Sequence, residues 1–225
     1  MSQSKPTSSE ENPAAEELQA NTAMAFGTPI ATHSWPDSDT ANASLRDIVL
    51  AEEQVSPGME RSNVGAWHSD LLFLQKKEPA VVQLVERIKQ MTGSITRAVT
   101  VDAELAGSVH FSLQGWATVL RDSGYNMVHN HPNSLWSGVY FVSAGEPDER
   151  GPNNGKLELL DPRAGINMVN IRGTIMEGRY LVQPLSGLMV IFPSWLSHFV
   201  HPFFGQGERI SIAFNIVSPK RASKD

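Results

Sequence analysis

The sequence predicts a mainly β fold, a sandwich or jelly roll, with helices that precede it in the chain. After about residue 108, short runs rich in β-branched and aromatic residues alternate with Gly, Pro and Asn, as strands joined by turns do. About seven such runs follow one another, as in a small two-sheet fold. Before them, apolar residues recur at helical spacing. We therefore expect two helices that pack against the outside of one sheet.

The chain is expected to comprise a tail and one domain. Residues 1–22 are rich in Ser, Glu, Pro and Ala, and this composition favours a disordered acidic tail. Residues 23–225 are long enough for a single domain. Within it, residues 24–35 predict a short strand, helices are expected within about 40–92, and the jelly-roll core is expected over about 108–217.

The helices and strands are predicted from local spacing. Leu45, Ile48 and Val49 form one apolar stripe. Pro79 suits the first turn of a second helix. The buried stripe of that helix is expected to comprise Val81, Val82, Leu84, Val85, Ile88 and Met91. The strands are predicted from the runs VHFSLQGWATVLR, SGVYFVSA, GKLELLDP, GRYLVQP, GLMVIFPSW, SHFVHPF and ERISIAFNIV.

Composition excludes several classes of function. The chain has no cysteine, so disulfides, thiolate zinc sites and Cys nucleophiles are excluded. The net charge is −6 with no basic stripe, so we expect no nucleic-acid partner. No apolar run approaches the roughly 18 residues of a membrane helix, and the N-terminus has no apolar signal segment. We expect a cytoplasmic protein with no membrane partner.

The histidines suggest a metal site. Four of the seven histidines fall in two pairs, His129 with His131 and His198 with His201. Residues at i and i+2 of a strand point to the same face, so strands facing across a jelly roll could gather three or four imidazoles. Imidazole is a ligand for Fe, Cu, Ni and Zn. The alternative interpretation is that each histidine is a structural core or surface residue.

Arg209 and Ser211 suggest an anion site. They alternate in phase with Ala213 on a predicted strand that follows the second histidine pair. An arginine on the inner face of a barrel is costly unless it meets an anion. Arginine binds a carboxylate in a fixed fork, and a neighbouring hydroxyl adds a donor. The alternative is that Arg209 faces solvent or pairs with a structural carboxylate.

The order of these residues resembles that of the Fe(II)/2-oxoglutarate-dependent oxygenases. His-x-His before a strand, a distal histidine about 70 residues later, and Arg-x-Ser about ten residues after that follow the pattern of this superfamily. The resemblance is closest to the 2OG-Fe(II) oxygenases of small bacterial proteins and covers roughly residues 25–217. It is carried by the segments RSNVGAWHSD, HNHPNSLWSGVYFV, GKLELLDPR, PLSGLMVIFPSWLSHFVHP and ERISIAFN.

The resemblance implies a double-stranded β-helix, a cupin-like jelly roll, and a set of site residues. His129 would be the first metal ligand and His198 the distal one, since HFVHP resembles the distal ligand motif of prolyl hydroxylases. Arg209 and Ser211 would hold the far carboxylate of 2-oxoglutarate. Apart from the resemblance, Asn126, Tyr140 and Trp195 lie near the candidate ligands in sequence and are expected to line the cofactor pocket, where Tyr140 could hydrogen-bond to the oxo-acid. The segment at 61–70 is expected to be a loop over the mouth of the active site.

One position departs from the family pattern. The usual facial triad contains two histidines and one carboxylate. Here His131 stands at the carboxylate position, and no Asp or Glu occurs between Asp122 and Glu146. Either His131 completes a three-histidine triad, or a carboxylate comes from elsewhere in the chain. Asn133 is a weaker alternative as an oxygen ligand.

The predicted function is that of a non-haem Fe(II) dioxygenase. With 2-oxoglutarate and O2, such an enzyme would hydroxylate an unactivated C–H bond of a small-molecule or peptidyl substrate. One alternative is a three-histidine dioxygenase that needs no 2-oxoglutarate, in which Arg209 would bind the substrate. Another is a non-catalytic metal-binding jelly-roll module. A homodimer is left open.

Overall fold

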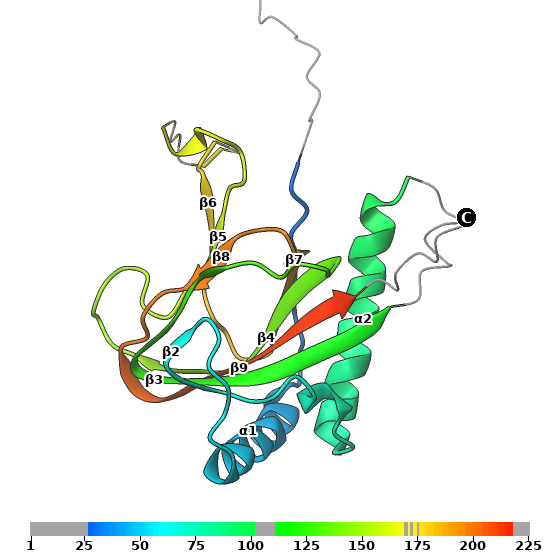
Figure 1. Cartoon of the computed structure of the whole chain (residues 1–225), viewed down its shortest axis with the longest axis vertical. Helices are drawn as coiled ribbons and strands as arrows, with labels where there is room; N and C mark the ends of the chain where they lie inside the picture. Colours follow the sequence, from blue (N-terminus) through cyan, green and yellow to red (C-terminus); the bar gives the residue numbers. More distant parts are fainter. Residues whose placement is uncertain (1–26, 102–110, 169–170, 172, 175, 218–225) are drawn as a thin grey trace, which may run out of the picture.

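The fold is a single strongly curved antiparallel sheet that curls into a double-stranded β-helix, with helices against one outer face (Figure 1). The computed structural model describes residues 27–101, 111–168, 171, 173–174 and 176–217. The strands are β1 (Ala31–Ser34), β2 (Asn63–His68), β3 (Ser112–His129), β4 (Trp136–Pro147), β5 (Leu157–Leu160), β6 (Arg179–Val182), β7 (Leu188–Pro193), β8 (His198–Val200) and β9 (Gly205–Val217).

The long strand β3 joins the two halves of the barrel. Hydrogen bonding gives the order β1-β7-β4-β9-β3-β8-β5-β6, and β2 pairs with β3 outside this path. The first half of β3 pairs with β9, from Ser112 opposite Val217 to Leu120 opposite Arg209. The end of β3 pairs instead with β8, where His129 lies opposite His198. The bend in one strand thus brings the two predicted ligand segments side by side.

The helices cover one outer face of the sheet (Figure 1). They are α1 (Asp39–Val55) and α2 (Pro79–Val99), with short 3-10 helices at Phe73–Gln75 and Ile166–Met168. Pro79 lies in the first turn of α2 as predicted. Of the expected stripe on α2, Val82 is exposed, while the remaining residues are buried or pack against the core.

Side chains along β9 point alternately into the hydrophobic core and into the interior of the barrel. Every second residue packs against the helices, and these residues are Ile210, Ile212, Phe214 and Ile216. The residues between them face the cavity inside the barrel, and they are Arg209, Ser211, Ala213 and Asn215. Because successive side chains of a strand point to opposite faces, one strand supplies both the hydrophobic core and the polar lining.

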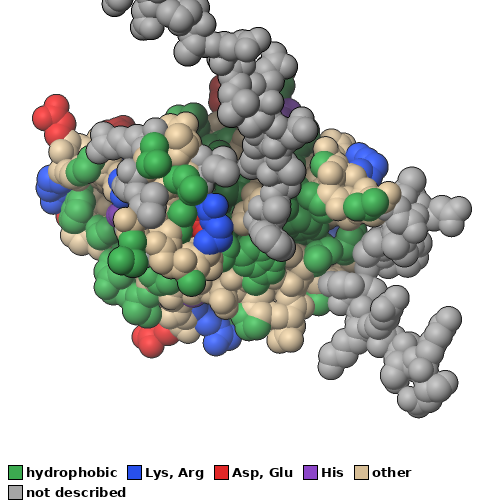
Figure 2. Space-filling model, turned by 90° about the horizontal axis from the view of Figure 1, so that it is seen from above, with side chains coloured by type: hydrophobic (Ala, Val, Ile, Leu, Met, Phe, Trp, Pro, Cys, Tyr) green, Lys and Arg blue, Asp and Glu red, His purple; other side chains and the backbone are tan. Residues whose placement is uncertain are grey.

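The jelly-roll prediction and the placement of the helices before it are confirmed. The segment at 61–70, however, is not the expected loop, because most of it forms β2 and pairs with β3. The predicted tail at 1–22 lies outside the described residues. Among the described residues, no helix is both long and apolar enough to cross a membrane. In the described part of the face in Figure 2, charged side chains of both signs are scattered among hydrophobic ones.

Candidate metal centre and cosubstrate pocket

A cavity of about 570 Å³ opens inside the barrel. Strands β2, β3, β4, β5, β7, β8 and β9 all contribute to its wall. Its size is within the range typical of small-molecule sites, roughly 300–1,000 Å³. The lining contains aromatic and aliphatic side chains, several polar groups, two arginines and four histidines, but no described aspartate or glutamate.

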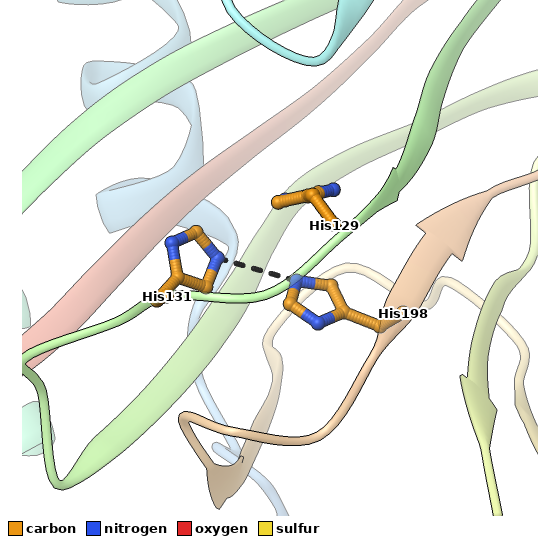
Figure 3. A group of neighbouring side chains, drawn as sticks. All are labelled: His129, His131 and His198. Atoms are coloured by element: carbon orange, nitrogen blue, oxygen red, sulfur yellow. Dashed lines mark hydrogen bonds between the residues drawn. The ribbon is translucent and has the colours of Figure 1, made fainter.

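Three histidines converge inside this cavity (Figure 3). His129 ends β3, His131 follows it in the next loop, and His198 begins β8. One ligand atom from each residue can be chosen so that all three lie within 4.8 Å of one another. The Nε2 atoms of His131 and His198 are 3.2 Å apart. Two nitrogens bound to one ion at about 2.1 Å in adjacent octahedral positions would lie about 3 Å apart, so this spacing fits a shared metal ion.

Backbone carbonyls orient two of the three imidazoles. The Nδ1 atom of His129 lies 2.7 Å from the carbonyl oxygen of Met127, and Nδ1 of His198 lies 2.8 Å from that of Leu196. A carbonyl can only accept, so each Nδ1 carries the proton and donates it. Each Nε2 atom is then left with a free lone pair, which is the tautomer that a metal ligand requires.

His131 is oriented by a side-chain amide instead. Its Nδ1 atom lies 3.5 Å from the amide of Asn215, and the Ser137 hydroxyl donates to that amide's oxygen at 2.8 Å. The two ends of an amide are assigned rather than observed. With the amide turned over, the Asn215 oxygen accepts the Nδ1 proton of His131, the Asn215 Nδ2 donates to Ser137 Oγ, and Nε2 of His131 becomes free for a metal. Trp116 packs beside the His131 ring, with centroids 5.5 Å apart.

Replacing Asn215 by alanine should weaken metal binding. The variant leaves Nδ1 of His131 without its partner, so the ligand tautomer and ring orientation are no longer fixed. Loss of such an outer partner typically costs about 10- to 100-fold in metal affinity. Competition with a chelator measures the change. Asn126→Ala is the control, because that amide also lines the cavity but bonds to Ser62. Equal affinities for the two variants would contradict the role of Asn215.

Burial keeps the three imidazoles neutral. It lowers the pKa of His198 to about 3 and that of His131 to about 4, and the charge that His129 would carry acts in the same direction. The pKa of His129 is also lowered, mainly by burial. Metal ligands must be unprotonated. The cluster is therefore ready to bind a cation at neutral pH without first losing protons.

Metal affinity should consequently resist mild acid. We expect it to stay nearly constant from pH 7 to about 5.5 and to fall as the pH approaches the lowered pKa values. Equilibrium dialysis against a buffered metal ion at each pH measures this. The metal-free protein should lose stability as the pH falls below about 6.5, because its unfolded chain then binds protons that the folded imidazoles refuse. Half-loss of metal near pH 6.5 in folded protein would contradict the lowered pKa values.

Arg209 lies in the wall of the same cavity, and one of its hydrogen-bond donors has no acceptor among the described residues. Its side chain is only 1% exposed. Its Nε donates to the carbonyl oxygen of Gly155 at 2.9 Å, and its guanidinium lies over the Phe141 ring at 5.2 Å. Gly155 has a φ of 64°, which favours glycine, and this conformation presents the carbonyl. Among the described residues, Nη1 of Arg209 is buried and has no hydrogen-bond partner.

The unpaired guanidinium is poised for an anionic ligand. Burial alone lowers the pKa of Arg209 to about 10, so the group is still charged at neutral pH. A buried charge without a counterion is costly, and a bound carboxylate would relieve that cost. Ser211, also predicted, is buried on the same face of β9 two residues further on.

Of the other three predicted pocket residues, one is in the cavity and two are not. Asn126 lines the cavity and donates to Ser62 Oγ at 3.2 Å. Tyr140 lies on the helix side of the sheet, where its hydroxyl donates to Asn42 Oδ1 at 2.7 Å. The prediction for Tyr140 is therefore wrong. Side chains alternate along β4, and it is the neighbours Val139 and Phe141 that face the cavity. Trp195 is exposed and does not line the cavity.

The structure also shows where the alternative metal ligands, His201 and Asn133, lie. His201 lies outside the cluster and pairs with Glu158 at 2.8 Å, so the preference for His198 is consistent with the structure. Asn133 is exposed in a turn with a φ of 66° and does not line the cavity. No carboxylate of the described residues joins the three histidines. The three-histidine set is thus the arrangement that the described residues support.

Several cavity residues were not foreseen from the sequence. Asn215 shares the inward phase of Arg209 and Ser211 on β9, and that period of two was available in the sequence. Arg61 and His68 also line the cavity, from the segment expected to be a loop. His68 stacks on Trp116 with centroids 5.5 Å apart, a contact that no sequence pattern indicates.

Comparison with known proteins gives a family match over part of the chain and a shared fold. Residues 114–215 match the model of the family described as "Putative 2OG-Fe(II) oxygenase". A sequence comparison with curated proteins finds no match. A prolyl-4-hydroxylase from Pseudomonas putida is similar in structure, with a TM-score of 0.59, 13% identity, and coverage of 84% of this chain and 92% of that one.

Two further solved structures have the same fold. HygX from Streptomyces hygroscopicus, with nickel and 2-oxoglutarate bound, has a TM-score of 0.57 and 14% identity, covering 86% of this chain and 84% of its own. A Trichoplax adhaerens prolyl hydroxylase in complex with a peptide fragment has a TM-score of 0.53 and 10% identity, covering 84% and 83%. The matched segment contains the histidine cluster and Arg209, and the fold is shared. Residues 114–215, a little under half of the chain, are therefore similar to the 2OG-Fe(II) oxygenase family, and the fold is the one that these solved structures share.

Proposed function

We propose that this protein is an Fe(II)/2-oxoglutarate-dependent dioxygenase that hydroxylates an unactivated C–H bond of a small-molecule or peptidyl substrate. In this proposal His129, His131 and His198 hold the iron, and Arg209 with Ser211 holds the cosubstrate. One observation carries it: the buried, unpartnered Nη1 of Arg209 lies in the wall of the same cavity as the three-imidazole cluster. A cation site and an anion site in one cavity suit a metal ion and a dicarboxylate.

The donor set fits ferrous iron. Imidazole nitrogen is an ordinary ligand of Fe(II), and three ligands on one face of an octahedron leave three positions for cosubstrate and oxygen. When bound, the iron and 2-oxoglutarate supply the oxidative chemistry, in which O2 and 2-oxoglutarate yield succinate, CO2 and a hydroxylated product. The hydrogen bonds from His129 and His198 to backbone carbonyls keep the ligand geometry fixed.

The remaining groups bind the cosubstrate and exclude water. Arg209 would pair with the carboxylate remote from the metal, and the Ser211 hydroxyl would donate beside it. The apolar part of the cavity wall includes Phe141 beside Arg209, Phe192 beside His198, and Val139. Such a wall lowers the local dielectric, which strengthens the pairing of charges inside the cavity.

Names of similar structures are consistent with both substrate classes. HygX was solved with nickel, 2-oxoglutarate and hygromycin B bound, at a TM-score of 0.52 and 13% identity. The Trichoplax prolyl hydroxylase was solved with a peptide fragment. These similarities support a small molecule or a peptide as substrate of this chain without preferring either.

A second function is supported by the third histidine. Three neutral ligands leave Fe(II) one unit more positive than the usual triad with a carboxylate, which favours direct binding of an anionic substrate. Arg209 would then hold that substrate, and no 2-oxoglutarate would be needed. The requirement for 2-oxoglutarate distinguishes this alternative.

The proposal predicts that Fe(II)-loaded protein converts 2-oxoglutarate to succinate under air. In the absence of substrate this conversion should still occur, at a low rate. Succinate formation is the measurement. Tyr140→Phe should leave the rate and the affinity for 2-oxoglutarate unchanged, because Tyr140 contacts Asn42 outside the cavity. Saturating iron with no succinate above the metal-free control would reject 2-oxoglutarate as the cosubstrate.

A further inference from the structure

The cavity is positively charged in a protein that is negatively charged as a whole. The chain has a net charge of −6. Yet the cavity wall contains Arg61 and Arg209 and no aspartate or glutamate among the described residues. The four histidines of the wall add no negative charge. A cavity of one sign with low-dielectric walls concentrates ligands of the opposite sign.

The positive charge remains after the proposed cofactors are bound. A ferrous ion and a 2-oxoglutarate dianion cancel in charge, which leaves the two guanidinium groups uncompensated. In the usual facial triad a carboxylate ligand would cancel one of them. His131 occupies that position here and is neutral, so the loaded cavity keeps an excess of positive charge. An anionic substrate would supply the missing negative charge.

Arg61 is the cation available to the substrate. It lies just before β2, at the exposed rim of the cavity, whereas Arg209 is buried in the wall. Its backbone N–H donates to Asn63 Oδ1 at 2.8 Å, which fixes the turn that presents its side chain. Ion pairs among the described residues involve other arginines, and Arg61 forms none of them. The rim therefore carries a guanidinium that is free to bind a ligand.

We propose that the substrate is an anionic small molecule whose carboxylate or phosphate binds Arg61 at the cavity rim. Its apolar part would lie against Trp116 and Leu71, which line the same cavity. Arginine suits either anion, because its planar fork pairs with two oxygens at once. The inference rests on the proposed function, since it assumes that Arg209 is occupied by 2-oxoglutarate.

The test uses four probes with one ring and different head groups. Protein loaded with Zn(II) and 2-oxoglutarate, which does not turn over, is titrated calorimetrically with phenylacetate, phenyl phosphate, phenylacetamide and 2-phenylethylamine. We expect at least one anion to bind about 10-fold or more tightly than the amide, and the amine to bind weakest. Comparing the two anions shows which head group the rim prefers.

Two variants test whether the preference for anions depends on Arg61. Arg61→Gln should bind the anions about as weakly as the amide, while its affinity for 2-oxoglutarate stays at the wild-type level. Arg97→Gln is the matched control, since it makes the same charge change at an exposed position of α2 and should keep the preference.

Two failures can be told apart. Normal 2-oxoglutarate binding with no preference for either anion, or a preference that survives Arg61→Gln, would overturn the inference alone. Failure of 2-oxoglutarate to bind the wild-type Zn(II) protein would overturn the proposed function, and the inference with it.

Discussion

Replacing His198 by alanine should abolish tight metal binding. His198 is 5% exposed and its Nε2 lies 3.2 Å from that of His131, so it occupies the centre of the cluster. Loss of an outer partner alone costs about 10- to 100-fold in affinity, and loss of a ligand should cost more than about 100-fold. Elemental analysis after dialysis, and chelator competition, measure the effect.

His201→Ala is the matched control. It removes the neighbouring histidine of the same motif, which pairs with Glu158 instead of facing the cluster. It should keep wild-type metal affinity. A His198→Ala protein that folds and retains stoichiometric metal would rule out this centre. His131→Ala should also lose affinity, and if it does not, the iron is held by two histidines and the three-histidine set is wrong.

Replacing Arg209 by methionine should remove 2-oxoglutarate binding while leaving the metal in place. Truncating one partner of a buried charge pair costs about 2–5 kcal/mol, which corresponds to about 30- to 5000-fold in affinity. Methionine fills similar space without a charge, and in the absence of ligand Nη1 has no partner to lose among the described residues. The variant loses the Nε hydrogen bond to Gly155 but also removes an uncompensated buried charge, and because these two effects oppose each other we expect it to stay folded.

Calorimetric titration of the Zn(II)-loaded variant with 2-oxoglutarate measures the loss. Arg209→Lys should restore part of the affinity, since it keeps the charge but not the fork. Unchanged binding in Arg209→Met would mean that another group holds the dicarboxylate. Loss of metal in the same variant would mean that Arg209 supports the fold rather than the ligand.

The sequence predicts which side chains of β9 face the cavity, but it does not predict which side chains of β4 do so. On β9 polar residues alternate with large apolar ones, so Arg209 and Ser211 are separated from Ile210 and Ile212 by pattern alone. On β4 both faces are covered, one by helices and one by the cavity. Val139, Tyr140 and Phe141 are therefore all hydrophobic, and no alternation indicates which of them faces inward.

The identity of the third metal ligand could not be predicted from the sequence, because it depends on the three-dimensional structure. The sequence left open whether His131 binds or a carboxylate comes from elsewhere. The answer depends on the bend of β3, which turns its last residues toward β8, and on the alternation that points Glu158 of β5 toward His201. Neither feature has a local signature. The contact of Asn215 with His131 spans 84 positions in the chain and is likewise invisible to spacing.

Anaerobic titration of the Fe(II)-loaded protein with 2-oxoglutarate tests the central claim most directly. The account predicts one iron per chain and a weak visible charge-transfer band that saturates at one 2-oxoglutarate per iron. The band should be absent in His198→Ala, which lacks the metal, and should need far more 2-oxoglutarate in Arg209→Met. Stoichiometric iron with no band and no 2-oxoglutarate binding would contradict the account and favour a three-histidine dioxygenase that acts on its substrate without a cosubstrate.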